Sequence, residues 1–200
     1  MQKNNSQSGM ADIIGCRYQV SALRDSFIPM ILDALGKTDT SKIWALTEKT
    51  STVYRGKSVH VVDCVKACFS HIYDDTSPYI SMSATFSKKS DDDMSKDCYI
   101  AQDDVLLNDT KKSFNVLGRI SLYPLGVSDY QEHSAKVVEL AVKRDVYVDE
   151  GHYISNIEGN IHDMFDFVND VLAYGNENID NYSLNVTMVI YGPEAREEKA

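Results

Sequence analysis

Apolar and polar positions along the first half of the chain follow two periods, and each change of period predicts a change of element. Two segments alternate as half-buried strands do, and two others repeat their apolar residues at helical spacing. Between the helical segments lie two β-rich runs joined by a short polar turn, which predicts a hairpin. The expected elements are a strand at 18–23, a helix at 27–35, strands at 43–47 and 51–55, a helix at 59–72 capped by Ser58, and a strand at 80–87.

The second half of the chain repeats this plan. CRYQVSAL (16–23) aligns with GRISLYPL (118–125) at a displacement of 102 residues, which matches Arg17 with Arg119. One inserted residue makes the displacement 103 over the first helix and the hairpin. Another makes it 104, where ISMSATF (80–86) aligns with LNVTMVI (184–190), and Asn160 is expected to cap the last helix. Two copies with so long a period predict two related domains rather than a solenoid.

The βαββαβ order is that of the ferredoxin-like unit, an antiparallel four-stranded sheet with both helices on one face. The expected fold class is therefore α+β, with tandem ferredoxin-like repeats and one uncovered face on each sheet. Between the copies, the run Asp91–Asp93 is more typical of a solvated acidic linker than of a Mg²⁺ or Ca²⁺ site. The expected boundaries are a flexible N-terminus at 1–13, repeat 1 at 14–87, the linker at 88–115, repeat 2 at 116–192 and a tail at 193–200.

Strand alternation also assigns side chains to the two faces of each sheet. We expect the uncovered faces to carry arginines, hydroxyls, amides and aromatic rings, which suit a flat hydrogen-bonding ligand. They suit a sheet-on-sheet interface as well, in which Trp44 and Tyr147 would be core residues. In the third strand Ser51 and Thr52 face opposite ways, and we favour Thr52, with Ser155 as its counterpart, partly on the resemblance given below. The candidate binding residues are Arg17, Gln19, Ser21, Trp44, Thr52, Ser83, Arg119, Ser121, Tyr123, Tyr147, Asp149, Ser155 and Asn185.

The charge balance narrows the range of partners. Thirty acidic residues against twenty basic ones give a formal charge of -10, which repels phosphate backbones and argues against nucleic-acid binding. No window approaches the ~20 consecutive apolar residues of a membrane span, and the first twelve residues lack the apolar core of a secretory signal. We therefore expect a cytoplasmic protein without membrane insertion.

Candidate catalytic chemistry is sparse. The sequence contains no dinucleotide-binding, phosphate-loop, zinc-protease or serine-hydrolase motif, and no nucleophile–base pair can be named. Cys64 and Cys68 are four residues apart, and we interpret them as small buried hydrophobes rather than metal ligands. His152 is expected in the turn region of the second hairpin, where a structural role is favoured over a ligand contact. We expect a protein that is not an enzyme and uses no cofactor or metal.

At these same residues the chain resembles the YkoF family of thiamine- and hydroxymethylpyrimidine-binding proteins. The resemblance rests on GRISLYPLGVSDY (118–130) and GHYISNIEGNIHDMFDF (151–167), and in the first copy on TDTSKIWALTEKTSTVYRGKSVHVVD (38–63) and ATFS (84–87). It implies a tandem ferredoxin-like homodimer that binds thiamine or its pyrimidine moiety without catalysis and takes part in thiamine precursor uptake or salvage. By position, it assigns ligand contacts to the hairpin hydroxyls Thr52 and Ser155, the arginines Arg17 and Arg119, and the S-L-Y-P residues Ser121 and Tyr123.

The two copies differ at these positions. The first copy has Gln19–Ala22 where the second has the family-like S-L-Y-P sequence, so we expect two unequal sites, with the tighter thiamine-type binding in the second copy. Edge strands and an open, aromatic-bearing face predict a homodimer. A structural or regulatory dimer without any ligand is the alternative function.

Overall fold

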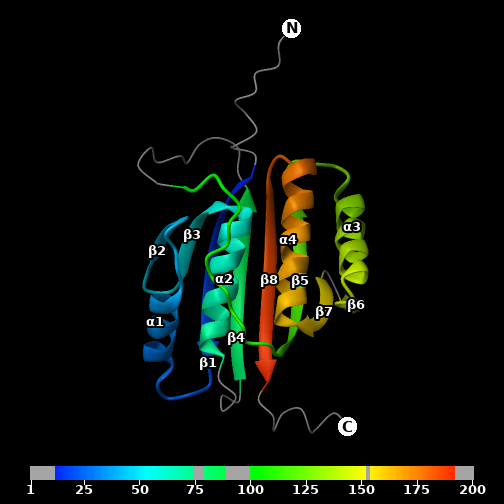
Figure 1. Ribbon diagram of the computed structural model, residues 1–200. Helices are drawn as coiled ribbons and strands as arrows, with labels where there is room; N and C mark the ends of the chain where they lie inside the picture. Colours follow the sequence, from blue (N-terminus) through cyan, green and yellow to red (C-terminus); the bar gives the residue numbers. More distant parts are fainter. Residues whose placement is uncertain (1–11, 74–78, 89–99, 152–153, 192–200) are drawn as a thin grey trace, which may run out of the picture.

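The computed structural model describes residues 12–73, 79–88, 100–151 and 154–191, and it has the predicted order of elements in both halves (Figure 1). Each half contains four strands and two helices. The first half consists of β1 (Ile13–Ala22), α1 (Phe27–Lys37), β2 (Trp44–Thr47), β3 (Thr52–Lys57), α2 (Ser58–Ile72) and β4 (Tyr79–Lys88). The second consists of β5 (Asn115–Pro124), α3 (Tyr130–Lys143), β6 (Tyr147–Gly151), β7 (Ile154–Asn160), α4 (Ile161–Asn178) and β8 (Tyr182–Tyr191).

The two repeats share one antiparallel sheet of eight strands, in the order β2-β3-β1-β4-β8-β5-β7-β6. Each half has the strand order of a ferredoxin-like unit, so the predicted tandem α+β fold is confirmed. The halves join through β4 and β8, which pair over their full length from Tyr79 opposite Tyr191 to Lys88 opposite Tyr182. Among the described strands, β2 and β6 are therefore the edges of the sheet.

Strand register corrects the alignment of the two repeats. Arg17 lies opposite Thr85, and Arg119 lies opposite Thr187, so the displacement of 102 residues seen in the first strand also holds in the fourth. The expected displacement of 104 in the fourth strand was wrong, because few identities constrain it there. Ser83 then corresponds to Asn185. An internal two-fold axis passes near Ala84 and Val186, which are equivalent residues and lie opposite each other at the junction.

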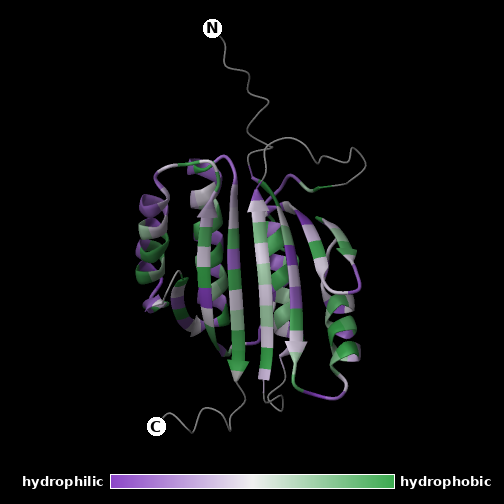
Figure 2. Cartoon of the chain, turned by 180° about the vertical axis from the view of Figure 1, so that it is seen from behind, coloured by the Kyte–Doolittle hydropathy of each residue, from purple (hydrophilic) through white to green (hydrophobic). Residues whose placement is uncertain are grey.

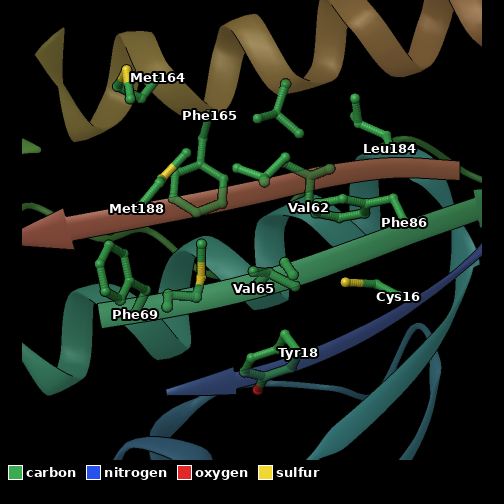
Figure 3. Close-up of a cluster of buried hydrophobic side chains, with 14 of the residues drawn as sticks. Cys16, Tyr18, Val62, Val65, Phe69, Phe86, Met164, Phe165, Leu184 and Met188 are labelled. Carbon is green, nitrogen blue, oxygen red and sulfur yellow. The ribbon is translucent and has the colours of Figure 1, made fainter. Parts of the chain in front are cut away.

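All four helices lie on one face of the sheet, with α2 and α4 over the central strands and α1 and α3 towards the two ends (Figure 1). One hydrophobic core runs beneath them through both repeats, and Figure 3 shows Val62 and Val65 of α2 and Phe165 of α4 meeting the side chains of the central strands. Phe86 of β4 and Met188 of β8 are fully buried there. Contact between α2 and α4 thus joins the repeats in addition to the pairing of β4 with β8.

The two outer helices are less covered. The apolar stripe of α1 was expected to face the sheet, but Phe27, Ile28 and Leu32 are exposed and only Ala34 is fully buried.

Of the two helix caps predicted at Asn160 and Ser58, the first is confirmed and the second is wrong. The Asn160 side chain caps α4 by accepting a hydrogen bond from the His162 backbone at 3.0 Å, as predicted. Ser58 is instead the first residue of α2, and its hydroxyl bonds to Asp12.

The described part of the linker, residues 100–114, packs against repeat 1 and crosses α2 (Figure 1). The Asp63 carboxylate of α2 accepts hydrogen bonds from the backbone of Leu107 and Asn108 and, at 2.8 Å, from the Asn108 side chain. Lys42 and Lys57 form ion pairs with Asp103 and Asp104. This segment is therefore anchored to repeat 1, although most of its side chains are exposed, and Asp91–Asp93 lie outside the described residues.

Candidate functional site

The face of the sheet opposite the helices is the candidate site (Figure 2). Its side chains form rows across neighbouring strands, because residues directly opposite each other in an antiparallel pair point to the same side. One row crosses the junction of the repeats and consists of Arg17, Thr85, Asn185 and Ser121. The internal two-fold axis relates it to a second row, which consists of Arg119, Thr187, Ser83 and Gln19.

Each row presents the same kinds of groups. A guanidinium stands at one end, two polar side chains from β4 and β8 lie in the middle, and a hydroxyl or amide stands at the other end. The Thr85 hydroxyl donates a hydrogen bond to the Asn185 side-chain oxygen at 3.1 Å across the junction. Ten of the predicted site residues lie on this open face, namely Arg17, Gln19, Ser21, Trp44, Ser83, Arg119, Ser121, Tyr123, Asp149 and Asn185.

The hairpin hydroxyls lie on the other face, so their predicted placement was wrong. Thr52 lies opposite the buried Tyr18, and Ser155 lies opposite the buried Ile120, so both point to the helix side. Thr52 is itself buried, and its hydroxyl is 3.2 Å from that of Thr47. The physical reason is the register of β3, which begins at Thr52 with that side chain on the helix side. The neighbouring Ser51 therefore lies on the open side, where it contacts Arg17.

Tyr147 also differs from the prediction. The register shifts by one residue between Tyr147 and Asp149, and this bulge sets Tyr147 opposite the buried Ile157. Its side chain packs, half-buried, against the hydrophobic core. Asp149, beyond the bulge, keeps its predicted place opposite Asn156 on the open face. A one-residue shift moves a side chain to the opposite face of a sheet, and simple alternation cannot foresee it.

Comparison with known proteins places this architecture in a family. The model of the YkoF-related family matches residues 13–93 and again residues 115–195, one match for each repeat. The chain is also 30% identical, over 194 residues and 96% of each sequence, to a Bacillus subtilis (strain 168) protein named "Putative HMP/thiamine-binding protein YkoF". The chain belongs to the YkoF-related family. The two family matches begin and end close to the two ferredoxin-like units of the sheet.

In this member of the YkoF-related family, the open face contains groups that the sequence analysis did not single out. Arg17 donates hydrogen bonds to Glu48 and Ser51, both at 2.6 Å, and so connects β1 to the turn of the first hairpin. Asn156 donates to Asp149 at 2.6 Å. Arg17 therefore has a carboxylate partner within its own repeat, whereas the carboxylate of Asp149 is held two strands away from Arg119. No sequence motif marks Glu48 in the hairpin turn. Only its contact with Arg17 in the folded chain shows that it belongs to the open face.

In the described part of the chain, the other side chains that could react or bind a metal do not form a site. Burial raises the pKa of the Cys68 thiol to about 11 and that of Cys64 to about 12, so neither is a ready nucleophile at neutral pH. Among the described residues, no three His, Cys, Asp or Glu side chains converge on a possible metal position. Within the same residues, none of the helices is both long and apolar enough to span a bilayer. His152 lies outside the described residues.

Proposed function

We propose that this protein binds thiamine or its hydroxymethylpyrimidine moiety, acts in the cytoplasm without catalysing a reaction, and serves thiamine precursor uptake or salvage. The observation that carries this proposal is the 30% identity, over 96% of both chains, to a protein whose name assigns it HMP and thiamine binding. The polar composition of the open face supports it.

The two open-face rows supply the hydrogen bonds that an aminopyrimidine needs. Its ring nitrogens accept hydrogen bonds, and its amino group donates them. Gln19 and Asn185 each offer both a donor and an acceptor in one amide, and Ser83 and Ser121 offer hydroxyls beside them. A thiazolium cation gains further stabilisation from the negative charge of Asp149 and of the chain as a whole.

Aromatic side chains on the same face suit the planar ring. Trp44 lies on the open side of β2, and Tyr123 lies on that of β5, where 44% of it is exposed. Stacking of a cationic ring on either side chain contributes roughly 0.5–2 kcal/mol. Because these residues lie in different repeats, we assign one binding site to each repeat.

A second copy of the chain completes the sites in this proposal. Ligand pockets are concave, and the face of a continuous sheet needs a second wall to enclose a small molecule. The open face spans all eight strands, and its central strands β4 and β8 bear short polar side chains, which suit close sheet-on-sheet contact. Light scattering is expected to give twice the chain mass of 22.5 kDa at micromolar concentration. A mass of one chain would contradict the dimer.

Calorimetric titration tests the binding proposal. We expect thiamine and hydroxymethylpyrimidine to release heat with two sites per chain. Ser83→Ala and Asn185→Ala are equivalent changes on the open face, and each is expected to weaken one site by about fivefold to tenfold through a lost hydrogen bond. Thr52→Val on the opposite face is the matched control and should leave both affinities unchanged. Absence of heat with millimolar thiamine would refute the function, and loss of binding in Thr52→Val alone would move the site to the helix side.

A further inference from the structure

A cavity of about 710 Å³ opens on the helix side of repeat 1, away from the open face. Four segments line it: the loop after β1, the beginning of α1, the end of α2 and the last part of the linker. Its polar lining includes Arg24 and Ser26 from the loop, His71 from α2, and Lys112 and Ser113 from the linker. The cavity thus gathers side chains that are far apart in the sequence.

The lining is cationic in an acidic chain. Arg24 and Lys112 bring two permanent positive charges, and none of the described lining residues is a carboxylate. The chain as a whole has a formal charge of -10. Lys112 is held in position because its ammonium group donates to the Tyr73 carbonyl at 2.7 Å and lies 5.9 Å from the centre of the Tyr73 ring. Such a concentration of positive charge and hydroxyl groups suits an anion.

His71 adds a neutral donor to this lining. Burial lowers its pKa, and the charges of Lys112 and Lys37 lower it further, against the opposing effect of Asp33. Asp33 itself forms an ion pair with Lys37 at 2.6 Å. At neutral pH the imidazole is therefore uncharged, and it can donate one N–H to an anionic ligand.

The equivalent place in repeat 2 has different side chains, including an acidic one. At the displacement of 103 residues, Met30 and His71 correspond to His133 and Tyr174, whose side chains are hydrogen-bonded at 2.7 Å. The His133 side chain is buried, and its ring centre is 5.8 Å from that of Tyr174. Asp129 stands where repeat 1 has Ser26, 3.6 Å from His133. A hydrogen-bonded histidine–tyrosine pair therefore stands in repeat 2 where repeat 1 has two residues that line the cavity.

From these observations we propose that the cavity of repeat 1 is an oxyanion site, which takes one phosphate or phosphate ester per chain between Arg24 and Lys112. The guanidinium of Arg24 has five N–H donors, so it can hold an oxyanion while it keeps its contact with the Met30 sulfur at 3.6 Å and its other interactions. His71, Ser26 and Ser113 then donate to the remaining oxygens. This site is separate from the proposed thiamine site, because it lies across the sheet from it.

Titration with inorganic phosphate tests the site, and binding is measured by calorimetry and by the phosphorus NMR signal. We expect one phosphate per chain, and affinity about tenfold weaker in Lys112→Gln and in Arg24→Gln, since each removes one charged hydrogen bond. Lys111→Gln is the matched control: it removes the same charge one residue away, from a side chain that does not line the cavity, and should change affinity less than about twofold. Thermal unfolding of each variant shows that it is folded.

Two further titrations distinguish failure of this proposal from failure of the proposed function. Thiamine titrated without phosphate should bind Lys112→Gln and the unaltered protein equally well, whereas Asn185→Ala should retain phosphate binding. Thiamine monophosphate distinguishes the two sources of the oxyanion: an affinity equal to that of phosphate identifies free phosphate as the ligand, and a gain of about tenfold or more that Lys112→Gln abolishes identifies a phosphate ester. No binding of either compound at millimolar concentration would overturn the proposal, as would equal weakening in Lys111→Gln and Lys112→Gln.

Discussion

The hydroxyl groups of Tyr18 on β1 and Tyr54 on β3 lie 2.8 Å apart in the interior of repeat 1, where both side chains are buried. Their rings are tilted at 50° with centres 5.1 Å apart. A buried hydroxyl is costly unless it has a partner. The pair therefore fixes the position of β3 against β1 on the helix side, next to Thr52.

This pair predicts unequal effects of single and double substitutions. Tyr18→Phe leaves the Tyr54 hydroxyl buried without this partner and should lower the free energy of unfolding by about 1–3 kcal/mol. The double variant Tyr18→Phe/Tyr54→Phe removes both hydroxyls and should be more stable than Tyr18→Phe alone. Urea unfolding of the three proteins measures the difference. Additive losses would mean that the two hydroxyls do not depend on each other.

Two helix glycines should respond oppositely to alanine. A Cβ at Gly175 of α4 would lie 2.9 Å from the Tyr182 ring, whose hydroxyl is in turn fixed by Asn176 at 2.8 Å. We expect Gly175→Ala to destabilise the fold by about 1–3 kcal/mol through overpacking. Gly36 of α1 has no atom within 4 Å of the equivalent position, so Gly36→Ala should stabilise the fold by about 0.5–1 kcal/mol. Thermal unfolding of both variants tests this, and a stable Gly175→Ala would show that the ring can move.

Stability should fall in alkaline solution. Burial raises the pKa of Cys68 and Cys64 from 9.0 to about 11 and about 12, and the pKa of Tyr18 rises for the same reason. Above pH 9 the unfolded chain releases these thiol protons while the folded chain retains them, so stability that is complete below that pH is lost as pH rises towards 12. Urea unfolding across this range should show the decline, and Cys64→Ala/Cys68→Ala should make it shallower. An unchanged slope in that variant would contradict the assignment to the thiols.

The two proposed thiamine sites should differ in affinity. Tyr123 of repeat 2 corresponds to Ser21 of repeat 1, so a ring at this position is available to the ligand in one site only. If the ligand covers that ring, Tyr123→Ser should weaken the tighter site by about fivefold to hundredfold, the equivalent of roughly 1–3 kcal/mol. Ser21→Ala is the control and should change neither site appreciably. Calorimetry resolves the two phases, and weakening of the looser phase alone in Tyr123→Ser would reverse the assignment.

Most of the fold could be predicted from the sequence because its periods are clear. Ile80, Met82, Ala84 and Phe86 alternate with polar residues, and all four are buried in β4 as the pattern indicates. The repeat itself identified both ferredoxin-like units. The pairing of β4 with β8 could not be foreseen, since nothing in a strand's own sequence names its partner across a domain junction.

The site was predicted less well, and each error arose from register. Thr52 was favoured over Ser51 partly on the family resemblance, whereas the residue at which β3 begins decides which of the two faces the open side, and a difference of one residue changes the face. Tyr147 was assigned by alternation, which the bulge before Asp149 interrupts. The cavity of repeat 1 involves Arg24 and Lys112, which are 88 positions apart, and only the folded path of the linker brings them together.

The junction at Ala84 and Val186 has an evolutionary consequence. An isolated half of this chain would expose the whole length of β4, and the obvious remedy is to pair that strand with the same strand of an identical molecule. Such an assembly would have two identical halves, and any substitution would appear in both. Covalent fusion of two gene copies frees each half to diverge, which is how His71 can line a cavity while its counterpart Tyr174 is hydrogen-bonded to His133.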